Sequence, residues 1–158
     1  MRTMTRTCLA AAMTTLLLGG GPAGAQDADL QAQIEAFQQQ YEQAVAAGDW
    51  AAISAMFTED ATFLPMTGGT VEGRSGVQGY YEQSGQAAVD IQSSTTEMLG
   101  ENLILDAGTF TLTLSEEAGG MEVPGEYVSI GEVGEGGIQI RHLMTFPVRQ
   151  PPTAPAQE

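Results

Sequence analysis

The 158-residue chain contains one cysteine, one histidine and no lysine. Cys8 lies in the first 25 residues, which we expect to be removed, so the mature chain has no thiol for a disulfide, a thiolate metal site or a covalent nucleophile. His142 is the only histidine, which excludes a multi-histidine metal site. We therefore predict neither a metal nor a cofactor.

Basic residues are scarce. After residue 25 only Arg74, Arg141 and Arg149 remain, against 20 Asp and Glu, which gives a formal net charge of −17. Such a surface repels the phosphates of nucleic acids and the headgroups of anionic lipids. We predict that the mature domain binds no nucleic acid and no membrane, and that its acidity serves solubility.

Long hydrophobic runs are also lacking. The apolar run Leu9–Leu18 is far shorter than the roughly 20 residues of a membrane-spanning helix. Arg2 and Arg6 precede the run and the small residues of Ala23-Gly24-Ala25 follow it, which is the order of a secretory signal peptide. We predict cleavage after Ala25 and a periplasmic or secreted protein.

Residues 26–148 form the predicted domain, and the Pro-rich residues 149–158 a flexible tail. Apolar residues recur at steps of three and four, which predicts a helix: Leu30, Ile34, Phe37, Tyr41 and Val45. Gly48 can adopt the left-handed backbone conformation that ends this helix, and Asp49 is the predicted N-cap of a second helix. That helix would carry Trp50, Ile53, Met56 and Phe57.

A third helix is predicted from the S-x-x-Q capping box that Ser75 opens. Its inner face would consist of Val77, Tyr80, Tyr81 and Ala88.

The remaining segments read as strands, over residues 61–64, 70–72, 91–99, 103–114, 121–133 and 138–148. In the strand 103–114, Phe110, Leu112 and Leu114 share one face, and three threonines occupy the other. Several consecutive long strands after helices indicate an α+β domain with an antiparallel sheet.

Four segments resemble one known family. They are YEQAVAAGD with MFTEDATF (Tyr41–Asp49 and Met56–Phe63), VEGRSGVQGYY (Val71–Tyr81), GEYVSI (Gly125–Ile130) and IQIRHLMTF (Ile138–Phe146). In this order they resemble SnoaL-like proteins of the nuclear-transport-factor-2-like superfamily, which includes ketosteroid isomerase. The branch they resemble most is the domain-of-unknown-function 4440 group.

The resemblance implies a cone, in which three helices pack into the concave side of a strongly bent sheet and leave one pocket. It also implies a small hydrophobic ligand and a homodimer. The side chains expected around the pocket are Phe37, Trp50, Phe57, Phe63, Tyr80, Tyr81, Phe110 and Met144.

Two polar side chains on strands are candidates for chemistry. Glu126 shares a strand face with Val128 and Ile130, and His142 shares one with apolar residues that include Met144. If those faces line the pocket, an acid and an imidazole lie among apolar groups, where each can exchange a proton.

The resemblance to ketosteroid isomerase implies a third candidate. Tyr41 matches the tyrosine on that enzyme's first helix, and Glu126 falls at its protonated carboxylic acid. The proton-moving carboxylate has no counterpart, since the matching segment is Phe63-Leu64-Pro65, which argues against steroid isomerisation.

Three functions stay open. The first is a non-catalytic module that binds a small hydrophobic molecule or dimerises. The second is an isomerase, dehydratase or cyclase, in which Tyr41 and Glu126 stabilise an oxyanion and His142 moves a proton. The third is an interaction subunit that uses the outer face of the sheet. Against the second, Tyr41 fits a core residue, Glu126 an interface acid and His142 a hydrogen-bonded wall residue.

Overall fold

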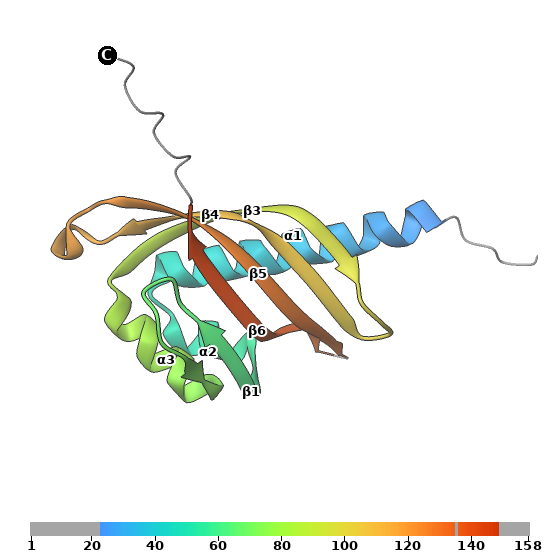
Figure 1. Cartoon of the computed structure of the whole chain (residues 1–158), viewed down its shortest axis with the longest axis horizontal. Coiled ribbons are helices and arrows are strands. Elements are labelled where there is room, and N and C mark those ends of the chain that lie inside the picture. Colours follow the sequence, from blue (N-terminus) through green and yellow to red (C-terminus); the bar gives the residue numbers. More distant parts are fainter. Residues whose placement is uncertain (1–22, 135, 149–158) are drawn as a thin grey trace, which may run out of the picture.

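The computed structural model describes residues 23–134 and 136–148 (Figure 1). The predicted signal peptide lies outside these residues except for its last three, and the predicted tail lies outside them. The described residues form three α-helices, one short 3-10 helix and six strands, in the order α1 (Ala23–Ala47), α2 (Trp50–Ala55), β1 (Phe57–Leu64), β2 (Val71–Glu72), α3 (Gly73–Ser84), β3 (Gln86–Met98), β4 (Leu103–Leu114), the 3-10 helix η1 (Glu116–Ala118), β5 (Glu122–Gly134) and β6 (Gly137–Pro147).

The junction of α1 and α2 follows the sequence prediction. Gly48 has a left-handed φ of 65°, and its N–H donates to the carbonyl of Val45 at 3.0 Å. The N–H of Ala52 donates to Asp49 Oδ1 at 2.9 Å, so Asp49 caps α2. This tight turn folds α2 back beside α1.

The third helix and the first strand differ from the prediction. Helix α3 begins at Gly73 after Glu72, whose side chain makes no capping bond, so the capping box at Ser75 is wrong. Gly85 ends α3 in a left-handed conformation, which leaves Ala88 in β3 rather than on the helix. Strand β1 begins at Phe57, because the short α2 already stops at Ala55.

One sheet joins all six strands in the order β2-β1-β6-β5-β4-β3. Its pairs are antiparallel except for β1 with β6, which run parallel. The sheet bends around α1, which packs against β3, and α3, which packs against β1 (Figure 1). The α+β cone with helices in the concavity of a bent sheet is therefore confirmed.

A bulge in β6 decides which side chains face the helices. Gly131 of β5 pairs with Ile140, but the preceding Ile130 pairs with His142, so Arg141 is an extra residue. The extra residue reverses the alternation, and Ile140 and Leu143 are buried while His142 points to the opposite face. The sequence prediction that His142 and Ile140 share a face is wrong for this reason.

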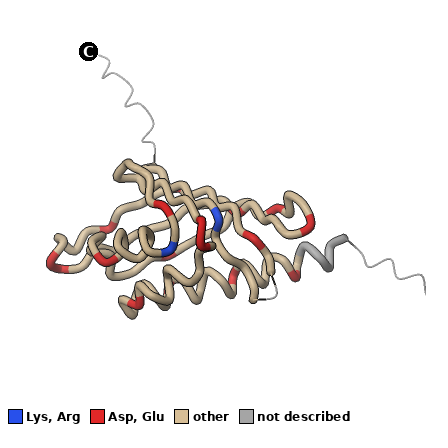
Figure 2. Tube along the Cα trace, turned by 90° about the horizontal axis from the view of Figure 1, so that it is seen from below, with Lys and Arg blue, Asp and Glu red and all other residues tan. Residues whose placement is uncertain are grey.

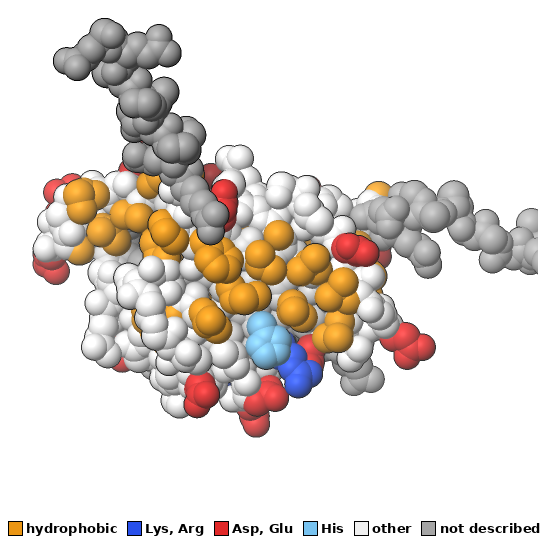
Figure 3. Space-filling model, in the orientation of Figure 1, with side chains coloured by type: hydrophobic (Ala, Val, Ile, Leu, Met, Phe, Trp, Pro, Cys, Tyr) orange, Lys and Arg blue, Asp and Glu red, His pale blue; other side chains and the backbone are white. Residues whose placement is uncertain are grey.

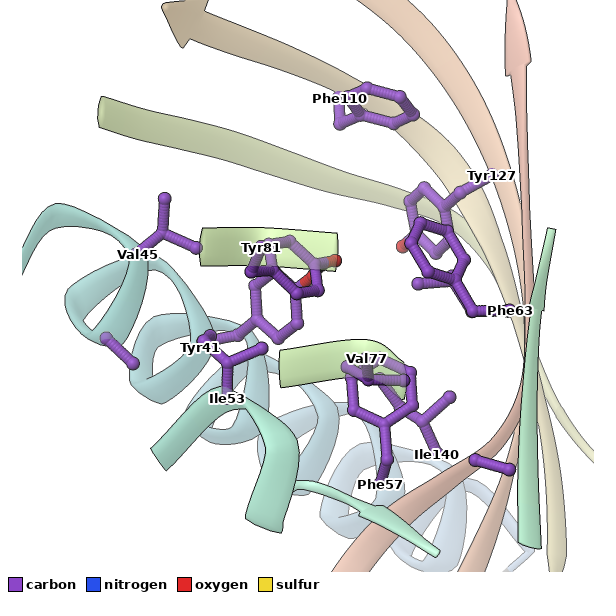
Figure 4. Close-up of a cluster of buried hydrophobic side chains, with 13 residues drawn as sticks. Tyr41, Val45, Ile53, Phe57, Phe63, Val77, Tyr81, Phe110, Tyr127 and Ile140 are labelled. Atoms are coloured by element: carbon purple, nitrogen blue, oxygen red, sulfur yellow. Dashed lines mark hydrogen bonds between the residues drawn. The ribbon is translucent and has the colours of Figure 1, made fainter. Parts of the chain in front are cut away.

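The buried core lies between the helices and the inner face of the sheet (Figure 4). Its fully buried side chains include Val45, Ile53, Phe57 and Val77. Four apolar side chains of this size each contribute about 1.5–3 kcal/mol on burial, which holds the helices to the sheet without a disulfide.

The outer face of the sheet is apolar along its middle. Cross-strand rows on this face join Ala107, Val128, Met144 and Leu64, and next to them Leu105, Ile130, His142 and Thr62. Figure 3 shows these strands from outside, with hydrophobic side chains in a continuous patch and His142 at its edge. The apolar residues of these two rows form the outer patch: Ala107, Val128, Met144, Leu64, Leu105 and Ile130.

Charged groups lie around this frame. Acidic residues are spread along the whole described chain, and arginines are few (Figure 2). Arg141 Nη1 contacts Glu132 Oε1 at 2.6 Å, and Arg141 Nη2 lies 3.9 Å from Asp60 Oδ2. Among the described residues, no helix has the length and apolar character needed to cross a membrane.

Candidate ligand pocket

A cavity lies inside the cone between α1, α3 and the inner face of the sheet. Its volume is about 90 Å³, and it is open on one side. Its walls are mainly aliphatic and aromatic, and they include Val89 and Ile91 of β3, Leu112 of β4 and Leu143 of β6. Apolar walls with a few polar groups are typical of small-molecule sites.

Most of the aromatic residues expected at the pocket are found around it. Five of them line the cavity together with Tyr41: Phe37, Phe63, Tyr80, Tyr81 and Phe110. Three expected residues lie elsewhere. Trp50 stacks behind the Tyr81 ring, Phe57 is completely buried below the cavity wall, and Met144 belongs to the outer patch.

Two tyrosines meet at the cavity wall. The hydroxyls of Tyr41 on α1 and Tyr81 on α3 form a short hydrogen bond, and both side chains are buried (Figure 4). Burial raises the pKa of both phenols above the ordinary value, so both stay protonated at neutral pH. Two hydroxyls that share one hydrogen bond keep one further O–H as a donor.

The aromatic rings around Tyr81 fix its position. Phe63 stacks on it with ring centroids 6.0 Å apart, and Trp50 stacks at the same distance. Tyr80 meets the edges of both Tyr81 and Phe63, at 5.4 Å and 5.0 Å. Rings packed in this way hold the phenol hydroxyl at a defined point of the wall.

A second polar group lies at the Asp106 carboxylate on the inner face of β4. Asp106 Oδ1 accepts from Ser93 Oγ at 2.8 Å and from Thr96 Oγ1 at 2.9 Å. Asp106 Oδ2 accepts from Tyr127 Oη at 2.7 Å and from Gln38 Nε2 at 3.2 Å. Four donors satisfy the buried carboxylate, and the network links α1 to strands β3, β4 and β5.

The Asp106 network also affects Tyr127. Burial, followed by the effect of the neighbouring carboxylate, raises the pKa of the Tyr127 phenol above its ordinary value. The phenol therefore stays protonated and acts as a donor toward Asp106.

The structure does not bring the three proposed catalytic residues together. Tyr127 and Ser129 of β5 line the cavity, so the alternating residues Glu126 and Val128 point to the other face, and Glu126 is exposed. The bulge at Arg141 places His142 on that outer face as well. Only Tyr41 lies at the cavity, so the predicted arrangement of three groups around one pocket is wrong.

Sequence reasoning missed Gln38, Asp106 and Tyr127 as cavity residues, and Ser93 as their hydrogen-bond partner. A signal for two of them was available. Gln38 lies four residues after Ile34 and three before Tyr41, on the apolar stripe of α1. Asp106 has the same strand parity as Ile104 and Phe110 on the buried face of β4. A polar residue at a core position indicates a hydrogen-bonded network.

Among the described residues, no group of three or more His, Cys, Asp or Glu side chains comes together in a way that could hold a metal ion.

Comparisons with known proteins address the family. The model of the SnoaL-like domain matches residues 37–142. A search of the curated proteins finds no match to this sequence. The chain is similar to a solved structure from Nostoc punctiforme, described as a domain of unknown function with a cystatin-like fold, at 20% identity over 77% of this chain and 79% of that one, with a TM-score of 0.64.

Two further solved structures carry the superfamily in their descriptions. An NTF-2 like protein of unknown function from Shewanella oneidensis is 14% identical over 73% of this chain and 98% of its own, with a TM-score of 0.63. A nuclear transport factor 2 (NTF2-like) superfamily protein from Salmonella enterica is 11% identical over 83% of this chain and 99% of its own, with a TM-score of 0.65. At these identities the three structures establish the fold, and the branch within the family stays a prediction. Because the family model spans more than half of the chain, the protein belongs to the SnoaL-like domain family.

Proposed function

We propose that this domain binds a small, largely apolar molecule in the cavity of the cone. The observation that carries the proposal is the cavity itself, with apolar walls and a buried Tyr41–Tyr81 pair that keeps one O–H donor without an acceptor among the described residues. A ligand oxygen that accepts from this O–H would compensate for the water the phenol loses on burial. The domain would recognise a ring or chain molecule with a carbonyl, ether or similar acceptor.

Binding to the cavity can be tested with a neutral hydrophobic fluorophore, N-phenyl-1-naphthylamine, whose lack of charge avoids repulsion by the acidic surface. The substitution Ile91→Phe adds volume at the cavity wall and should weaken binding at least tenfold. Gln92→Phe, on the next residue of β3 and the opposite face, is the matched control and should leave the affinity within twofold. Equal affinities for both variants would refute binding at this site.

A second candidate role is self-association through the outer patch. The support is the apolar row of Ala107, Val128, Met144 and Leu64 on a sheet face that no described helix covers. The occupant we propose is a second copy, because the same patch on two chains forms a symmetric isologous interface. Two chains of net negative charge repel each other, so the dimer should tighten as salt rises.

The dimer is testable by multi-angle light scattering at micromolar concentration. We expect a dimer for the parent chain and a monomer for Met144→Asp, which buries a charge in the interface. Gln43→Asp, at an exposed position of α1, adds the same charge away from the patch and should stay dimeric. A parent chain that is monomeric at high salt would end this proposal.

We also propose that residues 1–25 direct export and are removed. The support is the order of features along this segment, in which positive charge is followed by an apolar run and then by small residues. Expression in a bacterial host should yield periplasmic protein whose intact mass is that of a chain beginning at Gln26. Retention of the full-length mass in the cytoplasm would contradict it.

A further inference from the structure

The side-chain amide of Gln38 is held in one orientation. Its Nε2 lies 3.2 Å from Asp106 Oδ2, 3.1 Å from Tyr127 Oη and 2.6 Å from Ser93 Oγ. Four donors surround the Asp106 carboxylate, which therefore acts as an acceptor only. An acceptor attracts the amide nitrogen and repels the amide oxygen, so the carboxylate fixes which end of Gln38 faces it.

The other end of the amide is available. No group among the described residues donates to Gln38 Oε1, although the Gln38 side chain lines the cavity and its nitrogen is fully engaged. An amide oxygen accepts up to two hydrogen bonds. The network thus fixes a cavity-lining amide whose oxygen has no donor among the described residues.

The cavity has a complementary group one helical turn away. Gln38 and Tyr41 are three residues apart on α1, and such residues are neighbours on one helix face. Tyr41 and Tyr81 supply a phenol donor, whereas Gln38 supplies a carbonyl acceptor. A ligand that satisfies both must have an acceptor and a donor on the same skeleton.

We propose that Gln38 is a specificity-determining residue that selects ligands bearing a hydroxyl or N–H donor. Together with the tyrosine pair it defines the ligand class as a mainly apolar molecule that carries one hydrogen-bond acceptor and one donor. The inference rests on the proposed binding function and deepens it. Asp106, Ser93 and Tyr127 act as positioning residues, because they hold the amide and do not themselves need to touch the ligand.

The test uses three molecules that share one skeleton: benzophenone, 4-hydroxybenzophenone and 4-methoxybenzophenone. Isothermal titration calorimetry with the purified chain should show the hydroxyl compound binding about tenfold more tightly than benzophenone, an ordinary effect for one buried hydrogen bond. The methoxy compound, which has the oxygen but no donor, should show no such gain.

Variants separate recognition from structure. Gln38→Leu should abolish the preference for the hydroxyl compound, so that 4-hydroxybenzophenone and benzophenone bind equally. Ser129→Ala removes another polar group of the cavity wall and should retain the preference. A preference that survives Gln38→Leu, or a parent chain that binds all three compounds equally, overturns the assignment of Gln38 and leaves cavity binding intact. Failure of the parent chain to bind any of the three refutes both proposals for this ligand class, and the parent-chain comparison does not depend on the folding of a variant.

Discussion

Tyr127 Oη donates to Asp106 Oδ2 at 2.7 Å across the paired strands β4 and β5. The bond links the cavity-lining Tyr127 to a carboxylate that also accepts hydrogen bonds from Gln38 of α1 and Ser93 of β3. Besides the apolar core, this buried acid helps to fix the position of α1 over the sheet.

Replacing this acid should be costly. Asp106→Ala leaves three hydroxyls and one amide without their acceptor, and an unsatisfied buried polar group costs about 1–3 kcal/mol. Because these groups can partly pair with one another, we expect a total loss of about 3 kcal/mol in the free energy of unfolding. Urea denaturation followed by circular dichroism measures it. Asp90→Ala, at an exposed position of β3, is the control and should change stability by less than about 0.5 kcal/mol. A similar loss in both variants would show that the network contributes nothing specific.

The buried phenols predict a loss of stability in alkali. The pKa of Tyr41 and of Tyr81 is raised in the fold, so the unfolded chain releases these protons first as pH rises. Their contribution is complete below the unfolded value of about 10 and is lost as pH rises further, through the folded values. Urea midpoints at pH 8 and pH 11 should therefore differ, and Tyr41→Phe should reduce the difference. An unchanged difference in this variant would contradict the buried pair.

Gly108 lies where two strand backbones come unusually close. A Cβ on Gly108 would lie 2.0 Å from the carbonyl oxygen of Gln92 and 2.9 Å from Ser93 Cα. Since neither backbone atom can move without breaking the β3–β4 pairing, Gly108→Ala should cost about 3 kcal/mol. Differential scanning calorimetry should show a melting temperature lower by about 10 °C. Gly134→Ala, whose Cβ meets no described atom within 4 Å, should melt within a few degrees of the parent.

Gly125 controls the space available to a ligand. A Cβ there would lie 2.2 Å from Phe110 Cζ and 2.8 Å from Met66 Cε, and both of these side chains line the cavity. Gly125→Ala should push the Phe110 ring from the sheet toward the cavity and weaken binding of N-phenyl-1-naphthylamine about tenfold. The chain should still fold, because the displaced atoms are side-chain ends. Gly100→Ala is the control, because a Cβ there meets no described atom within 4 Å. If Gly125→Ala binds the fluorophore with the affinity of the parent chain, the fluorophore binds outside this cavity.

The elements with strong periodicity were predictable from the sequence. Strand β4 spans Leu103–Leu114 as the alternation indicates, and Phe110 and Leu112 face the cavity while the intervening threonine faces outward. The Gly48-Asp49 turn was predictable because each residue there has one conformational role. Local chemistry determines these features.

The candidate site was less predictable, for a physical reason. A single extra residue at Arg141 reverses strand parity and moves His142 to the outer face, and bulges leave no clear mark in a hydrophobic pattern. The prediction that Glu126 lines the pocket was wrong for another reason. Strand parity indicates which residues share a face of the sheet, but it does not indicate which face is the inner one. Asp106 and Gln38 are brought together by tertiary packing across 68 residues of sequence.

The parallel pairing of β1 with β6 also has a consequence for the order of folding. Phe57 pairs with Ile140 and Phe63 with Leu143, so the first strand meets its central neighbour only after nearly the whole domain has been synthesised. Contacts of such long sequence separation form slowly, because the intervening loop must close first. A nascent chain on the ribosome can form α1 and the β3–β4 hairpin, but it can complete its core only when the last strand has emerged.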